Sequence, residues 1–498
     1  MRSLRSKYLW VLPSISLVLL AIPMLLRQAA WLSLIALIPF VYYSQNCVKV
    51  TAKDVERAIF YPGILFGLIS FTWILQTSPS SWTALEGSLA LISKLVVWAV
   101  TALLVSGGYW LLGKYVAKFR NRPELLLWSL PVVWAISELL RVYSFSVVYY
   151  GPGGSLSPNW NVSLAGLPLM ATPFSYISRF VGLYGMSMVA VSINTALYLI
   201  LTKKRRRLAL AILGGVVALS VIGSILYQPN GQKLSVAAVH LGSRESLENW
   251  PRRAVPARDT DLLVLPEYSL IFQSKQAQEV ARNDLGKQTV LITSVATKDI
   301  PSRNVLTLYQ PQRGIFNQQS KTFLIAGGEY MPYIVTGIYK VIKQDYLIQA
   351  FNVSQQVRRG EHNEVPVDTG KFKVGSLVCS GVVALSEYRR LTSEGSEILT
   401  NPASLSLIAN ASLYHQQESY LTKFHAVSNA RPFVQASRSG ESYILNSNGY
   451  PLAKTKGNTG LIAAEVRTST KKTIYTLIGE WTLLVGPLLL VIFRRQLR

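Results

Sequence analysis

Eight long apolar stretches restrict how this chain of 498 residues can fold more than any other feature. An α-helix needs roughly 20 apolar residues to cross the hydrocarbon core of a bilayer, and all but the short second stretch approach that length. We therefore expect a multi-span α-helical membrane domain with about eight transmembrane helices. The stretches are Tyr8–Leu26, Trp31–Tyr43, Ile59–Leu75, Leu89–Leu112, Leu125–Phe145, Tyr176–Leu201, Leu208–Tyr227 and Tyr475–Phe493.

Basic residues gather in alternate loops between these stretches. The chain has 50 Lys and Arg against 25 Asp and Glu, a formal net charge of +25. With eight spans, one face carries the basic N-terminus, the basic loops before the third, fifth and seventh spans, and the C-terminal arginines. Because cytoplasmic loops are enriched in Lys and Arg, both termini are predicted to be cytoplasmic. Most of the charge then reflects topology, and no nucleic-acid partner is expected.

From Gln228 onward, short β-rich runs alternate with helical patterns, which predicts a layered α/β domain. We expect transmembrane helices one to seven in residues 1–227, a separate domain in 228–472, and the last transmembrane helix with a cytoplasmic tail in 473–498. Helices are expected at Leu270–Leu285, Val382–Glu394 and Tyr414–Ala430. Strands are expected at Leu234–His240, Leu262–Leu265, Thr289–Ser294, Asn304–Tyr309, Val374–Cys379, Ile398–Asn401, Phe433–Ser437 and Ser442–Leu445.

Cys379 ends one of these strand-like runs and is followed by a glycine-containing turn and a helical pattern. Enzymes use such a strand, turn and helix to lift a nucleophile out of a sheet. A thiol nucleophile also needs a base and a positive group that stabilises the oxyanion formed at a carbonyl. Glu267, after another buried-type strand, and Lys321 could supply these. Each residue alone is a weak signal, but the three together indicate a catalytic set.

The cysteines and histidines give no sign of a disulfide or a metal site. The chain has two cysteines, Cys47 and Cys379, which the predicted topology places on opposite sides of the membrane, so they cannot pair. The four histidines have no metal-type spacing. We expect no metal and no cofactor.

The order of Leu265-Pro266-Glu267, Lys321, the following Gly328-Glu329-Tyr330-Met331-Pro332 and a strand-borne Cys379 resembles the carbon–nitrogen hydrolase (nitrilase) superfamily. With seven apolar spans before this domain and one after it, the chain is similar to that superfamily's membrane-embedded family, the apolipoprotein N-acyltransferases. The resemblance covers nearly the whole chain. It implies an extracytoplasmic nitrilase-like domain folded as a four-layer αββα sandwich.

The resemblance also implies a reaction. Glu267 would be the general base, Lys321 would stabilise the oxyanion, and Cys379 would carry an acyl group as a thioester, with Glu329 in support. In a ping-pong reaction, a phospholipid, typically phosphatidylethanolamine, would donate the acyl chain to Cys379. The α-amino group of a lipoprotein's N-terminal diacylglyceryl-cysteine would then accept it. The expected location is the bacterial cytoplasmic (inner) membrane, with the catalytic domain facing the periplasm or cell exterior. We expect the protein to be a monomer.

The sequence departs from the family pattern beside the nucleophile. The family usually has an aromatic residue and then a glutamate directly after the cysteine, whereas this chain has Ser380 and Gly381. A carboxylate beside the thiolate is therefore absent, which affects thiolate stability and substrate placement. Two alternatives stay open: a membrane-tethered amidase or acyltransferase with another substrate, and a catalytically weakened scaffold homologue.

Overall fold

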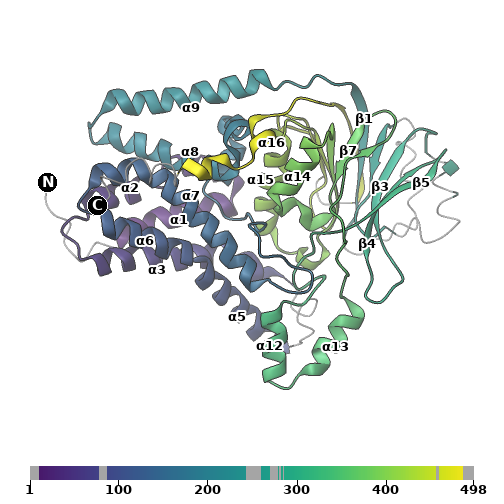
Figure 1. Cartoon of the computed structure of the whole chain (residues 1–498), viewed down its shortest axis with the longest axis horizontal. Coiled ribbons are helices and arrows are strands. Elements are labelled where there is room, and N and C mark those ends of the chain that lie inside the picture. The colour runs from purple at the N-terminus through teal and green to yellow at the C-terminus, as the bar shows by residue number, and fades with distance from the viewer. Residues whose placement is uncertain are drawn as a thin grey trace.

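A computed structural model describes residues 10–77, 87–242, 260–269, 279, 282–283, 285–455 and 459–485. Two parts lie side by side in it (Figure 1). A bundle of long helices forms one side, and two β-sheets with short helices form the other. Helices α14 (Leu385–Ser393), α15 (Ser412–Ser428) and α16 (Ile474–Ile478) lie between the bundle and the sheets, so the two parts share an extensive interface.

The helical part is built from the N-terminal half of the chain. Within the described residues, five segments are long and apolar enough to cross a membrane: Ala52–Gln76, Gly87–Phe119, Pro123–Val148, Pro173–Leu201 and Arg206–Leu226. The shorter apolar helix α1 precedes them. The helices are α1 (Val11–Leu25), α2 (Ile38–Asn46), α3 (Ala52–Ser70), α5 (Gly87–Val105), α6 (Gly107–Phe119), α7 (Pro123–Val148), α8 (Ser178–Leu201) and α9 (Arg206–Leu226).

The expected count of eight spans is not confirmed. The second stretch is broken into a 3₁₀ segment, Arg27–Leu34, and the nine-residue helix α2. In the last stretch the structure describes only α16 (Ile474–Ile478) and the 3₁₀ turn Trp481–Leu484. Residues 486–498, with the rest of that stretch and the tail, lie outside the described residues. The start of the first stretch, at residues 8–9, also lies outside them.

Glycines allow the helices of the bundle to approach closely. A Cβ atom at Gly108 of α6 would meet the Ser137 carbonyl of α7, and a Cβ at Gly67 of α3 would lie 2.9 Å from the Ala102 carbonyl oxygen. Small residues at such crossings bring backbones together where the hydrophobic effect gives little drive for association. The bundle therefore packs around α3, α6 and α7.

Two six-stranded sheets form the core of the second part, one with strand order β12-β1-β2-β3-β4-β5 and the other β11-β10-β9-β8-β7-β6. In each sheet the three central strands are parallel: β1, β2 and β3 in one, and β7, β8 and β9 in the other. The remaining pairs are antiparallel. The strands are β1 (Lys233–His240), β2 (Leu262–Val264), β3 (Val290–Ala296), β4 (Asn304–Gln310), β5 (Gly314–Ser320), β6 (Val367–Asp368), β7 (Lys373–Ser376), β8 (Ile398–Ser404), β9 (Phe433–Arg438), β10 (Tyr443–Leu445), β11 (Pro451–Lys454) and β12 (Gly460–Arg467).

The central strands are buried apolar runs, as parallel strands covered on both faces should be. All eight expected strands occur, with boundaries shifted by a few residues. The more polar edge strands β5, β6, β11 and β12 were not predicted, because they have weak hydrophobic patterns. The helices after β5 are α12 (Tyr333–Val341), α13 (Asp345–Ser354), α14 (Leu385–Ser393) and α15 (Ser412–Ser428). The helix expected at Leu270–Leu285, which would cover the first sheet, lies almost entirely outside the described residues.

Helix α15 joins the sheets to the helical bundle. Its Gln417 side chain donates to the Ser70 carbonyl of α3 at 3.1 Å and accepts from the Ser163 amide at 2.8 Å. The Tyr420 hydroxyl donates to the Pro23 carbonyl of α1 at 2.9 Å. These polar contacts are buried, so breaking them would leave unpaired groups at a cost of about 1–3 kcal/mol each. α15 thus fixes the bundle against the second sheet.

Candidate active site

Cys379 does not lie on the strand where we expected it. Strand β7 ends at Ser376, and Cys379 opens a short 3₁₀ turn, Cys379–Val383, with a backbone φ of +47°. A non-glycine residue in this left-handed region is strained, and such strain is common at functional sites. The turn therefore presents the thiol at the end of the strand.

Neighbouring residues hold this turn in place. The Asn401 side chain donates to the Cys379 carbonyl at 3.3 Å, and the Ser380 hydroxyl donates to the Phe323 carbonyl at 2.8 Å. A Cβ at Gly381 would lie 2.5 Å from the Leu377 Cβ, so the turn closes only because residue 381 has no side chain. The thiol itself lies 3.4 Å from the Ser404 carbonyl oxygen.

Glu267 follows β2 of the first sheet, and its side chain reaches the Cys379 turn. Its Oε2 accepts from the Ser404 amide at 3.0 Å, and its Oε1 accepts from the Asn304 side chain at 2.6 Å. Ser404 therefore contacts both the carboxylate and the thiol through its backbone. β2 and β7 belong to different sheets, so the packing of the two sheets brings Glu267 and Cys379 together at Ser404, across 112 positions of sequence.

Lys321 directly follows β5 and is almost fully buried. Its Nζ donates to Glu267 Oε1 at 3.1 Å and to Glu329 Oε1 at 2.9 Å. Glu329 is fixed in turn by the Ile325 amide, which donates to its other oxygen at 2.9 Å. All four residues expected from the sequence, including Cys379, therefore line one cavity of about 650 Å³.

The charges in this cavity favour a resting thiol with a nearby proton acceptor. Burial opposes protonation of Lys321, but attraction to Glu267 and Glu329 outweighs it and raises the pKa of the ammonium group. Burial raises the pKa of Glu267, and Lys321 only partly offsets this. Burial and the Glu267 charge together raise the pKa of the Cys379 thiol. Glu267 is thus suited to accept a proton when the sulfur attacks a carbonyl.

Sequence reasoning missed several residues of the site. Asn304, the first residue of β4, donates to Glu267 and lies 3.4 Å from Glu329 Oε1. The Tyr268 hydroxyl lies 3.3 Å from the same oxygen. Nothing in their local sequence marks either residue. Glu418 of α15 also lines the cavity. The sequence contains a signal that could have identified it, because Glu418 is a single carboxylate on the buried face of an expected helix.

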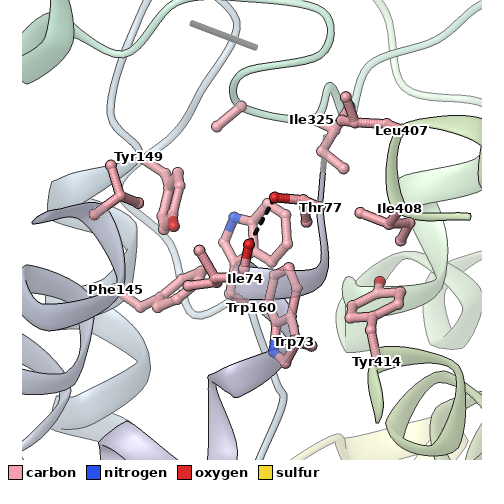
Figure 2. Close-up of a pocket in the computed structure, with 12 residues that line it drawn as sticks. Trp73, Ile74, Thr77, Phe145, Tyr149, Trp160, Ile325, Leu407, Ile408 and Tyr414 are labelled. Carbon is pink, nitrogen blue, oxygen red and sulfur yellow. Dashed lines mark hydrogen bonds between the residues drawn. The ribbon is translucent and has the colours of Figure 1, made fainter. Parts of the chain in front are cut away.

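A second, apolar cavity adjoins the first. It measures about 540 Å³ and lies between the helical bundle and the loops of the α/β part. Figure 2 shows Trp73, Phe145, Tyr149 and Trp160 from the bundle facing Ile325, Leu407, Ile408 and Tyr414. The last four residues also line the polar cavity, so the two spaces share a wall. An apolar chain could extend from the thiol toward the bundle.

His425 contacts the Cys379–Val383 turn, and its burial leads us to expect that the fold is sensitive to acid. Its Nε2 donates to the Val382 carbonyl at 2.7 Å, and burial lowers the pKa of the imidazole to about 4. The stabilising contribution is present above the unfolded pKa near 6.5 and is lost as the pH falls toward 4. Thermal unfolding should show a loss of ~3 kcal/mol over this range. His425→Gln should flatten that dependence, and an unchanged profile would contradict this prediction.

The fold and site define the class of protein. The carbon-nitrogen hydrolase family model matches residues 225–475, about half of the chain, and the chain belongs to this family. A carbon-nitrogen hydrolase from Helicobacter pylori G27 of known structure is 19% identical, with a TM-score of 0.35, covering 52% of this chain and 94% of its own.

More specific relatives match nearly the whole chain, helical part included. An apolipoprotein N-acyltransferase from Geobacter metallireducens is 25% identical over 479 residues, covering 88% of this chain and 85% of the relative. One from Shewanella oneidensis is 22% identical over 482 residues, covering 88% of each. The chain is thus similar to apolipoprotein N-acyltransferases, and with its apolar helices this indicates a membrane protein.

Proposed function

We propose that this protein is an apolipoprotein N-acyltransferase, which moves a fatty acyl chain from a phospholipid to the N-terminal diacylglyceryl-cysteine of a lipoprotein. The observation that carries the proposal is the shared wall between the Cys379 cavity and the apolar cavity at the helical bundle. A soluble amidase acting on small amides has no need for such a space. A lipid donor does, because its acyl chain must leave the membrane beside the thiol.

In the first half-reaction, the Cys379 sulfur attacks the ester carbonyl of the donor, with phosphatidylethanolamine as the expected lipid. Glu267 takes the thiol proton, and the Lys321 ammonium group stabilises the negative oxygen of the tetrahedral intermediate. The C–O bond then breaks, and the leaving alkoxide takes the proton from Glu267. A lysophospholipid departs and Cys379 holds the acyl group as a thioester, while Glu329 keeps Lys321 in position.

In the second half-reaction, the α-amino nitrogen of the lipoprotein attacks the thioester carbonyl. A C–N bond forms, the C–S bond breaks, and the Cys379 thiolate is released and reprotonated through Glu267. We propose that this occurs at the outer surface of the bacterial cytoplasmic membrane, where both lipid substrates are anchored. Residues 1–227 and 473–498 would form the membrane domain with cytoplasmic termini, and residues 228–472 the catalytic domain of a monomer.

Filling the apolar cavity should shorten the preferred acyl chain. Val97 of α5 lines this cavity but not the polar one. In Val97→Trp we expect kcat/KM for a palmitoyl donor to fall roughly 10- to 30-fold, because each methylene excluded from an apolar site costs about 0.8 kcal/mol. A butyryl donor should change less than about twofold. Chain-length profiles measured by lysolipid release test this.

The matched control is Leu95→Trp on the same helix. Leu95 is 43% exposed and does not line the cavity, so the same indole side chain should leave chain preference unchanged. If Val97→Trp and Leu95→Trp have the same chain-length profile, the apolar cavity does not bind the acyl chain. Ammonia release from small amides without acyl transfer would instead favour an amidase.

A further inference from the structure

A fourth charged side chain lines the catalytic cavity and takes no part in the chemistry above. Glu418 comes from α15, the helix that lies between the bundle and the sheets (Figure 1). Its side chain is only 4% exposed. A carboxylate is rarely buried to this degree without a cationic partner, because desolvation of the charge costs several kcal/mol.

The partners of Glu418 compensate this charge only in part. The Gln435 side chain donates to Oε1 at 3.2 Å, and His415 Nδ1 lies 3.7 Å from Oε2, beyond normal hydrogen-bond length. Among the described residues, no Lys or Arg forms an ion pair with Glu418. Lys321, by contrast, is shared between Glu267 and Glu329. The cavity therefore has one carboxylate cluster balanced by a lysine and one carboxylate whose ion-pair partner, His415, is charged only when protonated. Burial opposes that protonation, but Glu418 raises the pKa of the imidazole.

Glu418 is connected to the Cys379 turn within the cavity. Tyr414, one turn earlier on α15, lines both cavities. The Gln435 side chain that donates to Glu418 also accepts from Asn401 at 3.3 Å, and Asn401 lies 3.3 Å from the Cys379 carbonyl, so a short hydrogen-bonded chain joins the carboxylate to the Cys379 turn. A substrate that reaches the Cys379 thioester from this side meets Glu418.

We propose that Glu418 binds the protonated α-amino group of the acyl acceptor and orients it toward the Cys379 thioester. This inference rests on the proposed function, because only in the second half-reaction does an amine attack the acyl group. A primary ammonium supplies the missing counter-charge and three donors for the free carboxylate sites. The phosphatidylethanolamine donor also carries a primary ammonium, but that group stays on the leaving lysophospholipid and does not react, so acylation does not depend on orienting it.

The protons of the second half-reaction balance with this assignment. The ammonium loses one proton to the Glu418 carboxylate, and the freed lone pair attacks the thioester carbonyl. Glu267 takes the second proton from nitrogen as the C–N bond forms. The C–S bond breaks and the thiolate takes that proton from Glu267. The products are the amide, the free Cys379 thiol and one proton that passes from Glu418 to solvent.

Separate measurement of the two half-reactions tests the inference. The wild type and Glu418→Gln are acylated with phosphatidylethanolamine, and the acyl-enzymes are mixed with a diacylglyceryl-cysteine peptide. The substitution preserves size and a hydrogen-bond acceptor for Gln435. We expect acylation within about twofold of the wild type, which also establishes folding. Transfer to the peptide should be about 10- to 100-fold slower, as for loss of a charged hydrogen bond.

Hydroxylamine, which is uncharged at neutral pH, separates binding of a cation from a structural role. It should deacylate Glu418→Gln as fast as the wild type. Glu418→Asp, which keeps the charge, should recover most of the transfer. Glu465→Gln removes an exposed carboxylate of β12 and should transfer normally. The inference would be overturned if Glu418→Gln transferred the acyl group to the peptide as fast as the wild type does. It would also be overturned if the substitution slowed the reaction with hydroxylamine as much as the transfer to the peptide. A wild type that forms no acyl-enzyme would overturn the proposed function itself.

Discussion

Replacing Cys379 with alanine should abolish formation of the acyl-enzyme. Incubation with phosphatidylethanolamine should add the mass of one acyl chain to the wild type, and hydroxylamine should remove it. Cys379→Ala should show no adduct, and turnover should fall at least about 10³-fold, because the thioester cannot form without the Cys379 sulfur. Intact-mass spectrometry of the purified protein measures the adduct directly.

The other cysteine of the chain is the matched control. Cys47 is fully buried in the helical bundle, and its thiol donates to the Ser44 carbonyl at 3.5 Å. Cys47→Ser keeps that donor and should acylate like the wild type. An adduct that persists in Cys379→Ala would move the nucleophile elsewhere. A folded wild type that forms no adduct would favour the scaffold homologue.

Replacing Lys321 with methionine should damage both activity and stability. The substitution leaves Glu267 and Glu329 buried without their shared cation, which costs about 3–5 kcal/mol at neutral pH. Loss of the oxyanion partner should slow thioester formation at least about 10²-fold. Thermal unfolding in detergent and the initial rate of acylation measure the two effects separately.

The stability loss in Lys321→Met should depend on pH in a defined direction. Burial already raises the pKa of Glu267, and removing the cation raises it further. A carboxyl with a raised pKa in the folded state destabilises the fold as the pH rises through that value. The variant should therefore lose less stability at about pH 5 than at about pH 8.

Lys371→Met is the control for the Lys321 variant. Lys371 forms a 2.6 Å ion pair with Asp261, but its side chain is 47% exposed. Solvent screens such a pair, so its loss should cost less than about 1 kcal/mol and leave acylation unchanged. Equal effects of the two substitutions would contradict the special role of Lys321.

Much of the α/β part could be predicted because its central strands are continuous apolar runs. All eight strands predicted from the sequence occur in the structure, including those that end near Glu267 and Cys379. It missed α12 and α13, which follow Glu329, and it extended the nucleophile strand into the Cys379 turn. Hydrophobic periodicity reports burial of a segment, but it cannot report where the backbone leaves a sheet.

The sequence by itself indicated several apolar helices, the α/β part and the candidate residues Glu267, Lys321, Glu329 and Cys379, through local pattern, residue chemistry and resemblance to a known family. Only the tertiary structure decided what surrounds them. It closes the turn at Gly381 against Leu377, where a side chain has no room. It also brings Glu418 into the cavity from α15 and places an apolar space beside it. These arrangements join segments far apart in the chain, and no local pattern encodes such contacts.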